Sequence, residues 1–243
     1  MPEGPELRLA SIFINKVASK NFFTGKVVKS DLATKLVEVP FEAKTYVLQA
    51  ESRGKELKVY LNPTHEDEKK SKKNMKALPE QSVKHILFRF GMSGCFKLTS
   101  IEEIPKHAHL RFFTKDGKNV LSFVDYRRFG RWEINGNWGA DRGPDTVTEY
   151  PAFRQNVLEN LEKPAFNRPI CETLLNQKFF NGIGNYLRAE ILYRCKTAPF
   201  VQARSVLEPL KDQIKTEEPD ILELCNIIPK EVLSLGGGKG VRL

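Results

Sequence analysis

The hydrophobic periodicity of the chain changes once, and this change limits the fold more than any other feature. Up to about Trp138, many apolar residues alternate with polar ones, which is typical of half-buried strands. Beyond the stretch Asn137–Thr148, which is rich in Gly, Asp and Pro, the apolar spacing becomes three and four, which is typical of helices. We therefore predict a β-rich domain at residues 1–138, a linker at 139–148 and a helical domain at 149–243.

A helix is predicted to precede the strands, because Leu7, Ala10, Ile14, Val17 and Ala18 recur at helical spacing. One helix followed by several antiparallel strands predicts an α+β fold with a β-sandwich. The predicted strands are Tyr46–Ala50, Lys55–Leu61, His85–Phe90, Cys95–Leu98, His109–Phe113 and Val120–Val124. The predicted helices beyond the linker are Phe153–Leu161, Pro169–Gln177 and Tyr186–Arg194.

Residues 62–84 form a highly polar stretch without apolar periodicity, which predicts a long charged surface loop. Within it, Lys69–Lys73 is either a set of solvated lysines or a nuclear import signal.

Composition favours an anionic partner. The 243 residues carry a net charge of +9, and 40% are hydrophobic, so the chain can bury real cores. Nucleic acid is the first expected partner, and an acidic membrane is the second. Since no apolar run is long enough for a signal peptide or a membrane span, we expect an intracellular protein with no membrane association. The scattered cysteines predict neither a disulfide framework nor a zinc site; they are Cys95, Cys171, Cys195 and Cys225.

The first residues carry a possible nucleophile. Removal of Met1 would leave Pro2 with a free secondary amine, which forms a cationic iminium with a sugar aldehyde. Glu3 is a neighbouring proton donor or base, and Gly4 allows the backbone to bend sharply. Alternatively, the prolines and acids here, including Glu6, simply begin a helix, and the two interpretations are compatible.

Four glycine-containing turns display groups suited to nucleic acid. At the first hairpin tip, Lys55 is either solvated or placed to bind phosphate or to assist proton transfer. Met92 lies between two glycines, where it would expose a large apolar side chain. In Asp125–Trp132, arginines alternate with aromatic residues, which suits a DNA duplex, although a sandwich core with surface arginines explains part of the pattern. The turn before the last predicted helix offers backbone amides to an anion, and Asn185 is placed to contact a phosphate.

Six segments in this order resemble the formamidopyrimidine/endonuclease VIII family of DNA glycosylases, most closely its zincless vertebrate Nei-like type: PEGPELRLA, RGKEL, FRFGMSG, HAHLRF, DYRRFGRW and NQKFFNGIGNYLRAEILYR. The resemblance implies an N-terminal helix and antiparallel β-sandwich followed by a helix-two-turns-helix DNA-binding domain. Relatives continue into a C-terminal hairpin finger, which we expect to be absent because this chain stops at Leu243. Arg242 is therefore given no role.

The resemblance also implies roles for the N-terminal residues and the first hairpin. Pro2 would be the Schiff-base nucleophile that attacks the anomeric carbon of deoxyribose, and Glu3 would be the acid/base group. Lys55 would be a second proton donor near the sugar or phosphate, and Glu6 would support the pocket.

Further roles implied by the resemblance concern DNA. Met92, Arg127 and Phe129 would fill the gap left when a damaged nucleotide is flipped out of the helix. Asn185 would hold a backbone phosphate.

The activity implied is that of a bifunctional DNA glycosylase and AP lyase of base excision repair. It would remove oxidised bases, mainly pyrimidines and formamidopyrimidines, and cleave the strand by β- or β,δ-elimination without metal or cofactor. We expect a nuclear monomer that binds damaged DNA, and the sequence does not indicate whether other repair proteins are partners. The alternative is a truncated form or a non-catalytic DNA-binding protein with weak or no glycosylase activity.

Overall fold

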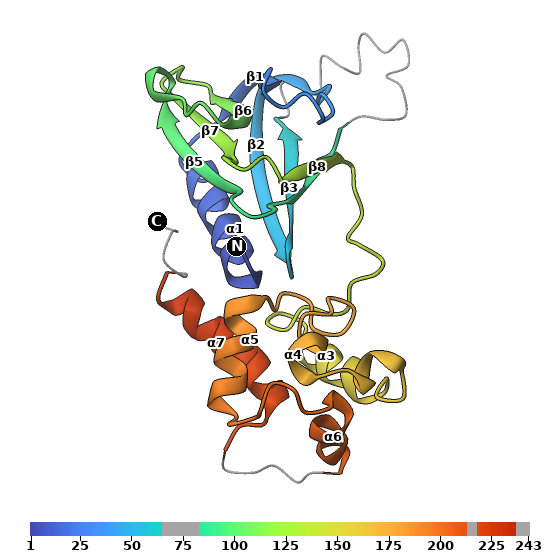
Figure 1. Cartoon of the computed structure of the whole chain (residues 1–243). Helices are drawn as coiled ribbons and strands as arrows, with labels where there is room; N and C mark the ends of the chain where they lie inside the picture. The colour runs from blue at the N-terminus through green and yellow to red at the C-terminus, as the bar shows by residue number, and fades with distance from the viewer. Residues whose placement is uncertain (65–82, 213–217, 237–243) are drawn as a thin grey trace. The chain divides into compact units, whose positions relative to one another are not determined.

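The computed structural model describes residues 1–64, 83–212 and 218–236, and the chain divides into two compact units (Figure 1). The strand unit comprises Met1–Pro2, Ala10–Ser52 and Glu56–Asn137. The helical unit comprises Glu3–Leu9, Arg53–Lys55 and the chain from Trp138 onward. Most of the predicted charged loop, including the lysine run, lies outside the described residues, although its first two residues belong to a strand.

In the described part of the chain, no helix has both the length and the apolar character that a membrane span requires.

The N-terminal helix is confirmed as α1, which spans Gly4–Ala18, and the five apolar positions that predicted it are all buried. Its later turns are attached to β2 through a polar contact. Asn15 Nδ2 donates a hydrogen bond to the carbonyl oxygen of Ala50 at 2.9 Å, and Asn15 Oδ1 accepts one from the Ala50 amide at 2.7 Å. One side chain thereby satisfies both backbone groups of a strand residue.

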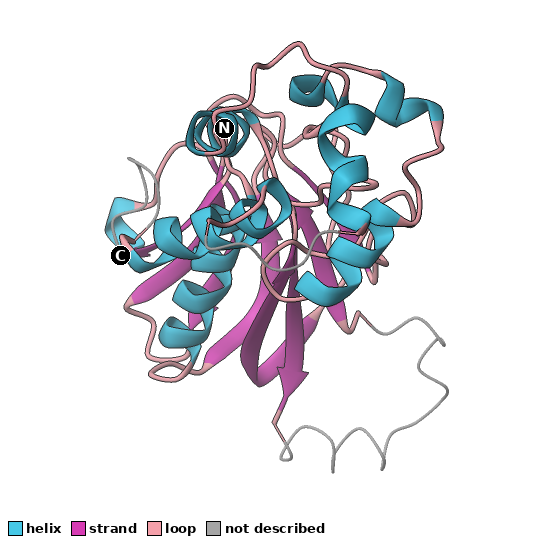
Figure 2. Cartoon of the chain, turned by 90° about the horizontal axis from the view of Figure 1, so that it is seen from below, coloured by secondary structure: helices cyan, strands magenta, loops and turns pink. Residues whose placement is uncertain are grey.

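Eight strands form one hydrogen-bonded sheet in the order β5-β7-β6-β1-β2-β3-β4-β8, drawn in magenta in Figure 2. The strands are β1 Phe23–Lys29, β2 Glu42–Arg53, β3 Glu56–Pro63, β4 His85–Arg89, β5 Cys95–Ser100, β6 Ala108–Thr114, β7 Asn119–Val124 and β8 Arg131–Ile134; a 3-10 turn, η1, spans Ile101–Glu103. The six predicted strands are present. We did not predict β1, in which a bulge beside Gly25 interrupts the pairing, or the short β8.

An aromatic core brings the two ends of this sheet face to face. Phe88 of β4 packs against Phe96 of β5 and Phe123 of β7, each with ring centroids 5.1 Å apart. Trp132 of β8 packs against Phe88 and Phe123 at 6.3 Å. Since β4 and β8 lie at one end of the strand order and β5 and β7 at the other, the sheet folds over itself as a sandwich, which confirms the predicted fold class.

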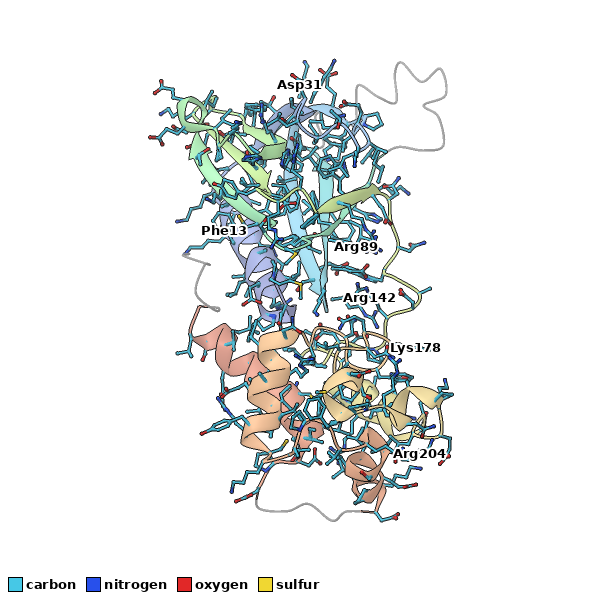
Figure 3. All side chains as sticks on the ribbon, viewed as in Figure 1. Phe13, Asp31, Arg89, Arg142, Lys178 and Arg204 are labelled. Atoms are coloured by element: carbon cyan, nitrogen blue, oxygen red, sulfur yellow. The ribbon has the colours of Figure 1, made fainter. Side chains whose placement is uncertain are left out.

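A buried ion pair supports the start of β3. Arg89, labelled in Figure 3, donates from Nε to Glu56 Oε1 at 2.7 Å and also pairs with Glu133 of β8. The Glu56 side chain is fully buried, so an unpaired charge at this position would be costly.

The helical unit has its own core, to which Phe153, Phe166, Leu174, Phe180, Leu187, Ile191 and Leu222 contribute. Its described helices are α3 Tyr150–Leu158, α4 Ile170–Thr173, α5 Asn185–Arg194, α6 Ala203–Leu207 and α7 Ile221–Ser234, with 3-10 turns η2 Pro164–Asn167 and η3 Glu208–Lys211. The prediction of α3 and α5 is confirmed, but the helix predicted over Pro169–Gln177 is wrong in length. It ends at Thr173, and Asn176 Oδ1 then accepts a hydrogen bond from the Lys178 amide in a turn.

Candidate active site

The Glu3 carboxylate caps the N-terminus of α5. It accepts hydrogen bonds from the backbone amides of Gly184 at 2.7 Å, Tyr186 at 3.0 Å and Leu187 at 3.3 Å. These are groups that a helix leaves without internal partners, and they lie at its positive end. The predicted anion site therefore exists, but a protein carboxylate occupies it rather than a phosphate. Asn185 is exposed beside it, and its contact with phosphate stays a prediction.

Burial controls the proton affinity of Glu3, whose residue is only 1% exposed. Desolvation raises the pKa of the carboxyl above its usual value, against the opposing effect of the three amide hydrogen bonds and of Lys55. The group is therefore more easily protonated than an ordinary glutamate. A side chain that both gives and takes a proton near neutral pH needs such a shift.

Lys55 is shifted in the opposite direction. Burial lowers the pKa of its ammonium group, Glu3 raises it, and the like charge of Arg142 lowers it further. Lys55 is therefore not simply a solvated cation at a hairpin tip. Since Glu3 and Lys55 are electrostatically coupled and their pKa values move toward one another, they have the properties of an acid/base pair.

Three glycines from distant segments meet and bring these residues together. The Gly4 amide donates to the Gly182 carbonyl at 2.9 Å, and a Cβ on Gly4 would lie 3.2 Å from Gly182 Cα. Gly54, with φ of +55°, packs so closely that a Cβ there would lie 1.9 Å from Asn181 Oδ1. Only residues without side chains allow this approach, and it places Glu3 beside the turn that carries Lys55.

Two acids that we did not predict hold the hairpin turn. Asp145 Oδ2 accepts a hydrogen bond from the Gly54 amide at 2.5 Å. Glu149 Oε2 accepts from Arg53 Nε at 2.7 Å and from the Asp145 amide at 2.8 Å. Arg53 is thus engaged in an internal ion pair. The only sequence signal for Asp145 was its place in the Gly-Asp-Pro-rich linker, which we interpreted as a connection alone.

Glu6 supports the start of α1, as the sequence suggested for an acid in a first helical turn. Its Oε2 accepts a hydrogen bond from the Glu3 amide at 2.8 Å. The Tyr186 hydroxyl donates to the same carboxylate, with 3.0 Å to each oxygen. The partly buried Pro2 immediately precedes this arrangement. Sequence reasoning missed Tyr186, which stood only at the expected start of a helix.

The exposed residues predicted to contact DNA lie on two joined turns of the strand unit. Met92 is 41% exposed and Phe129 is 58% exposed, and the Arg127 guanidinium lies 5.2 Å from the Phe129 ring centroid. Ser93 Oγ donates to Asp125 and accepts from the Arg127 amide at 3.0 Å, which ties the two turns together. The exposure predicted for Met92 is confirmed, whereas its role toward DNA stays a prediction.

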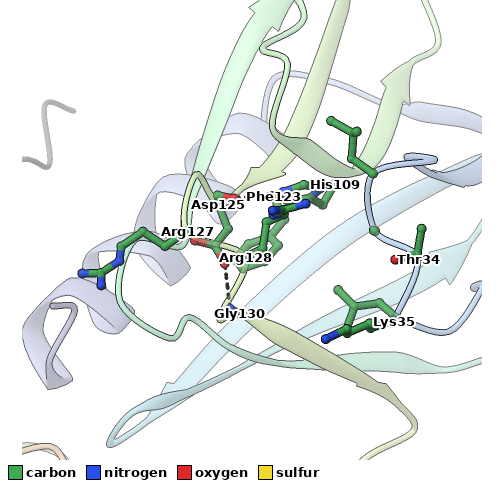
Figure 4. Close-up of a pocket in the computed structure, with 11 residues that line it drawn as sticks. Thr34, Lys35, His109, Phe123, Asp125, Arg127, Arg128 and Gly130 are labelled. Carbon is green, nitrogen blue, oxygen red and sulfur yellow. Dashed lines mark hydrogen bonds between the residues drawn. The ribbon is translucent and has the colours of Figure 1, made fainter.

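Asp125, another residue that we did not predict, anchors the arginine turn. It is 1% exposed, and its Oδ2 accepts a hydrogen bond from the Gly130 amide at 2.6 Å (Figure 4). A pocket of about 280 Å³ lies against this turn, lined by Leu32, Ala33, Thr34, Lys35, Leu36, His109, Phe123, Asp125, Arg127, Arg128 and Gly130. Its cationic side chains suit a polyanionic partner.

Within the described ranges, no group of three or more His, Cys, Asp or Glu side chains is arranged to hold a metal ion.

Known proteins are similar to this chain in sequence and in fold. Residues 1–132 match the family described as formamidopyrimidine-DNA glycosylase N-terminal domain. Endonuclease 8-like 1 of Homo sapiens is 51% identical over 98% of this chain, which spans 62% of that protein's length. A formamidopyrimidine-DNA glycosylase of Bacillus cereus is 31% identical over 85% of this chain and 71% of its own.

Solved structures of low identity support the fold. The Lactococcus lactis Fpg (MutM) in complex with an oxidized pyrimidine containing DNA matches with a TM-score of 0.69, at 17% identity, over 99% of this chain and 83% of that chain. The MutM (Fpg) protein from Thermus thermophilus matches with a TM-score of 0.65, at 23% identity, over 98% and 78%. Together with the identity to the curated relatives, these matches lead to one conclusion: the chain belongs to the formamidopyrimidine-DNA glycosylase family, as its sequence motifs predicted.

Proposed function

We propose that this chain is a bifunctional DNA glycosylase and AP lyase of base excision repair that removes oxidised bases, mainly pyrimidines and formamidopyrimidines. One observation carries the proposal. A buried carboxyl with a raised pKa, Glu3, directly follows Pro2 and is electrostatically coupled to Lys55, whose pKa is lowered. Family membership supports glycosylase chemistry, and the DNA complex of the Lactococcus lactis relative supports damaged DNA as the substrate.

In the proposed reaction, removal of Met1 frees the Pro2 nitrogen, which attacks C1′ of the damaged nucleotide. The C1′–N bond breaks, its electron pair leaves with the base, and the departing base gains a proton. The attacking Pro2 nitrogen then loses its proton. Protonation of O4′ allows the C1′–O4′ bond to break, which opens the sugar ring and leaves a cationic iminium between Pro2 and C1′. Glu3 and Lys55 move these protons at the sugar.

Strand cleavage follows from the same intermediate. The iminium acidifies C2′, and loss of a C2′ proton expels the 3′ phosphate. A second elimination expels the 5′ phosphate and gives the β,δ product. The same covalent adduct activates each bond that breaks in these eliminations. The residues near Pro2 therefore serve both base removal and strand cleavage.

DNA binding is assigned to exposed residues. Met92, Arg127 and Phe129 fill the gap beside the flipped nucleotide, and Asn185 contacts a backbone phosphate. The exposure of the first three on two joined turns supports this role, as does the net charge of +9. We assign the protein to the nucleus because its proposed substrate is DNA, and we propose that it acts as a monomer.

Borohydride trapping tests the proposal. Incubated with duplex DNA that carries an oxidised pyrimidine, the protein should form a borohydride-stable covalent adduct, and peptide mapping should place it at residue 2. A peptide extension that blocks residue 2 should abolish the adduct. Pro2→Ala is a weaker test, because a new terminal amine remains.

Two other outcomes would contradict the proposal in different ways. DNA binding without an adduct, by protein whose N-terminus is verified as free Pro2, would identify a non-catalytic DNA-binding protein. An adduct that maps to Lys55 would retain the lyase activity but remove Pro2 from the mechanism.

A further inference from the structure

Tyr186 contacts both acids of the N-terminal segment. Its backbone amide donates to Glu3 Oε1 at 3.0 Å, and its hydroxyl donates to the Glu6 carboxylate at 3.0 Å. Glu6 in turn accepts from the backbone amide of Glu3 at 2.8 Å. All three residues belong to the helical unit, so one residue at the start of α5 holds the first turn of α1 at two points.

The Glu6 contact restricts the nucleophile through covalent geometry. The Glu3 amide is the second half of the planar peptide that begins at the Pro2 carbonyl carbon. Glu3 is held at the start of α1, where its carbonyl accepts a hydrogen bond from the Leu7 amide at 3.3 Å. With Glu3 Cα placed in this way, fixing the direction of the N–H bond also fixes the peptide plane. The Pro2 nitrogen is attached to that plane through Cα, and rotation about the Cα–C bond is then the main remaining freedom between amine and helix.

We propose that Tyr186 is a positioning residue for the Pro2 amine, acting through Glu6 and the Glu3 amide. This inference rests on the proposed role of Pro2 as the nucleophile. The cost of a poorly oriented nucleophile is large, since a displacement of about 1 Å can reduce a rate by about 100-fold.

The phenol is suited to a permanent donor role. Burial, together with the negative charge of Glu6, raises the pKa of Tyr186 far above its ordinary value. The hydroxyl therefore keeps its proton at every pH at which the protein would be assayed. The Tyr186 hydroxyl is thus always available as a hydrogen-bond donor to Glu6.

Tyr186→Phe isolates the proposed contact, because it keeps the ring and the backbone hydrogen bond to Glu3 and removes only the hydroxyl. At saturating DNA that carries a natural abasic site, we expect borohydride trapping to be about tenfold slower, since a charge-assisted hydrogen bond is lost. The Kd for DNA with a stable abasic analogue should change less than about twofold. Tyr193→Phe is the matched control on the same helix, because the Tyr193 side chain is 80% exposed.

Substitutions of Glu6 separate positioning from stability. Glu6→Gln retains an oxygen that can accept from the Glu3 amide, so it should trap faster than Glu6→Ala. In a Glu6→Ala background, Tyr186→Phe should have no further effect, because the residue through which the hydroxyl acts is absent. The melting temperature of each variant is measured alongside, and trapping is compared below the lowest of them.

Two results would overturn the inference. One is a Tyr186→Phe variant that traps at the wild-type rate. The other is a Tyr186→Phe variant that binds DNA with a higher Kd but traps at an unchanged rate, which would make Tyr186 a DNA contact. An additive effect in the double variant would also contradict it. Failure of the proposed function is a distinct result, since wild-type protein with free Pro2 would then form no adduct.

Discussion

At the scale of single residues, the site depends on the opposed shifts of one acid and one base. Burial raises the pKa of Glu3 and lowers that of Lys55, and the two groups partly offset each other's shift. A glutamate and a lysine with ordinary pKa values would both be fully charged at neutral pH. Desolvation brings the pKa values of Glu3 and Lys55 closer together, so that each pKa approaches the range in which proton transfer is efficient.

Removal of a neighbouring charge should change the pH dependence of the reaction. Arg142→Gln removes the like charge that lowers the pKa of Lys55, so that pKa should rise toward its usual value. If Lys55 donates a proton, activity is lost as pH rises through its pKa. The alkaline limb of the single-turnover glycosylase rate should therefore move to higher pH in Arg142→Gln.

The control for this measurement is Arg168→Gln, since the Arg168 side chain is 70% exposed and pairs with Glu172. Both variants are compared at saturating DNA, so that weaker binding does not enter the rate. An alkaline limb that stays in place, or moves to lower pH, would contradict the role of Lys55 as the donor.

Stability should depend on pH through Glu3. Its pKa is higher in the folded protein than the usual value of 4.5, so the folded state favours the protonated carboxyl. The stabilisation that the protonated Glu3 carboxyl contributes is fully present below pH 4.5. It is lost as pH rises through the pKa that Glu3 has in the folded protein. The free energy of unfolding of the wild type, relative to Glu3→Gln, should therefore decrease between acidic and neutral pH. Urea denaturation across this range measures it, and an increase with pH would show that the pKa is lowered instead.

At the scale of elements, turns rather than helices or strands decide whether the site can form. Gly54 and Gly117 both occupy hairpin turns with positive φ, +55° and +69°. A Cβ on Gly117 meets nothing within 4 Å, whereas one on Gly54 would overlap the Asn181 side chain at 1.9 Å. The two glycines share a backbone requirement and differ only in their surroundings.

Alanine at each position should separate the cost of the left-handed backbone conformation from the cost of steric overlap with Asn181. Gly117→Ala should cost about 1 kcal/mol of unfolding free energy, because only the left-handed conformation is penalised. Gly54→Ala should cost about 2–4 kcal/mol, since displacement of Asn181 adds an overpacking penalty. Trapping should fall only in Gly54→Ala, whose turn carries Lys55. Equal losses of stability would show that the contact with Asn181 contributes nothing.

Local patterns predicted the elements well where one periodicity dominated. The apolar face of α1 follows directly from sequence, as do the positions of β3 and α5. The polar and apolar alternation in β3 predicted a half-buried strand, which is wrong, because Glu56 and Lys58 are buried as well as Leu57 and Val59. The pattern failed where side-chain contacts end or interrupt an element. Thr173 Oγ1, for example, donates to the Ala165 carbonyl at 3.0 Å where α4 ends, a contact that periodicity does not encode.

At the scale of the whole molecule, the candidate residues could be named from sequence, whereas the contacts that hold them could not. Residue type and motif pointed to Pro2, Glu3 and Lys55, whose catalytic roles stay predictions. The hydrogen bond between the Gly184 amide and Glu3 joins residues 181 positions apart, and no local pattern specifies it. Asp145, Asn181 and Tyr186 belong to the same class, since each gains its role only when distant segments meet.

The net charge of +9 should make DNA binding strongly dependent on salt. Each phosphate neutralised contributes about −0.9 to the slope of log affinity against log salt concentration, so contacts with three or four phosphates predict roughly 40- to 150-fold weaker binding at 0.2 M than at 0.05 M.

Met92→Ala provides the contrast, because an apolar side chain that fills a gap in DNA carries no charge. That variant should bind more weakly at every salt concentration, with the same slope as the wild type. Fluorescence anisotropy with DNA that carries an abasic analogue measures both quantities. A wild-type slope near zero would exclude phosphate contacts as the main source of affinity, and a reduced slope in Met92→Ala would show that Met92 acts by orienting cationic neighbours rather than as a wedge.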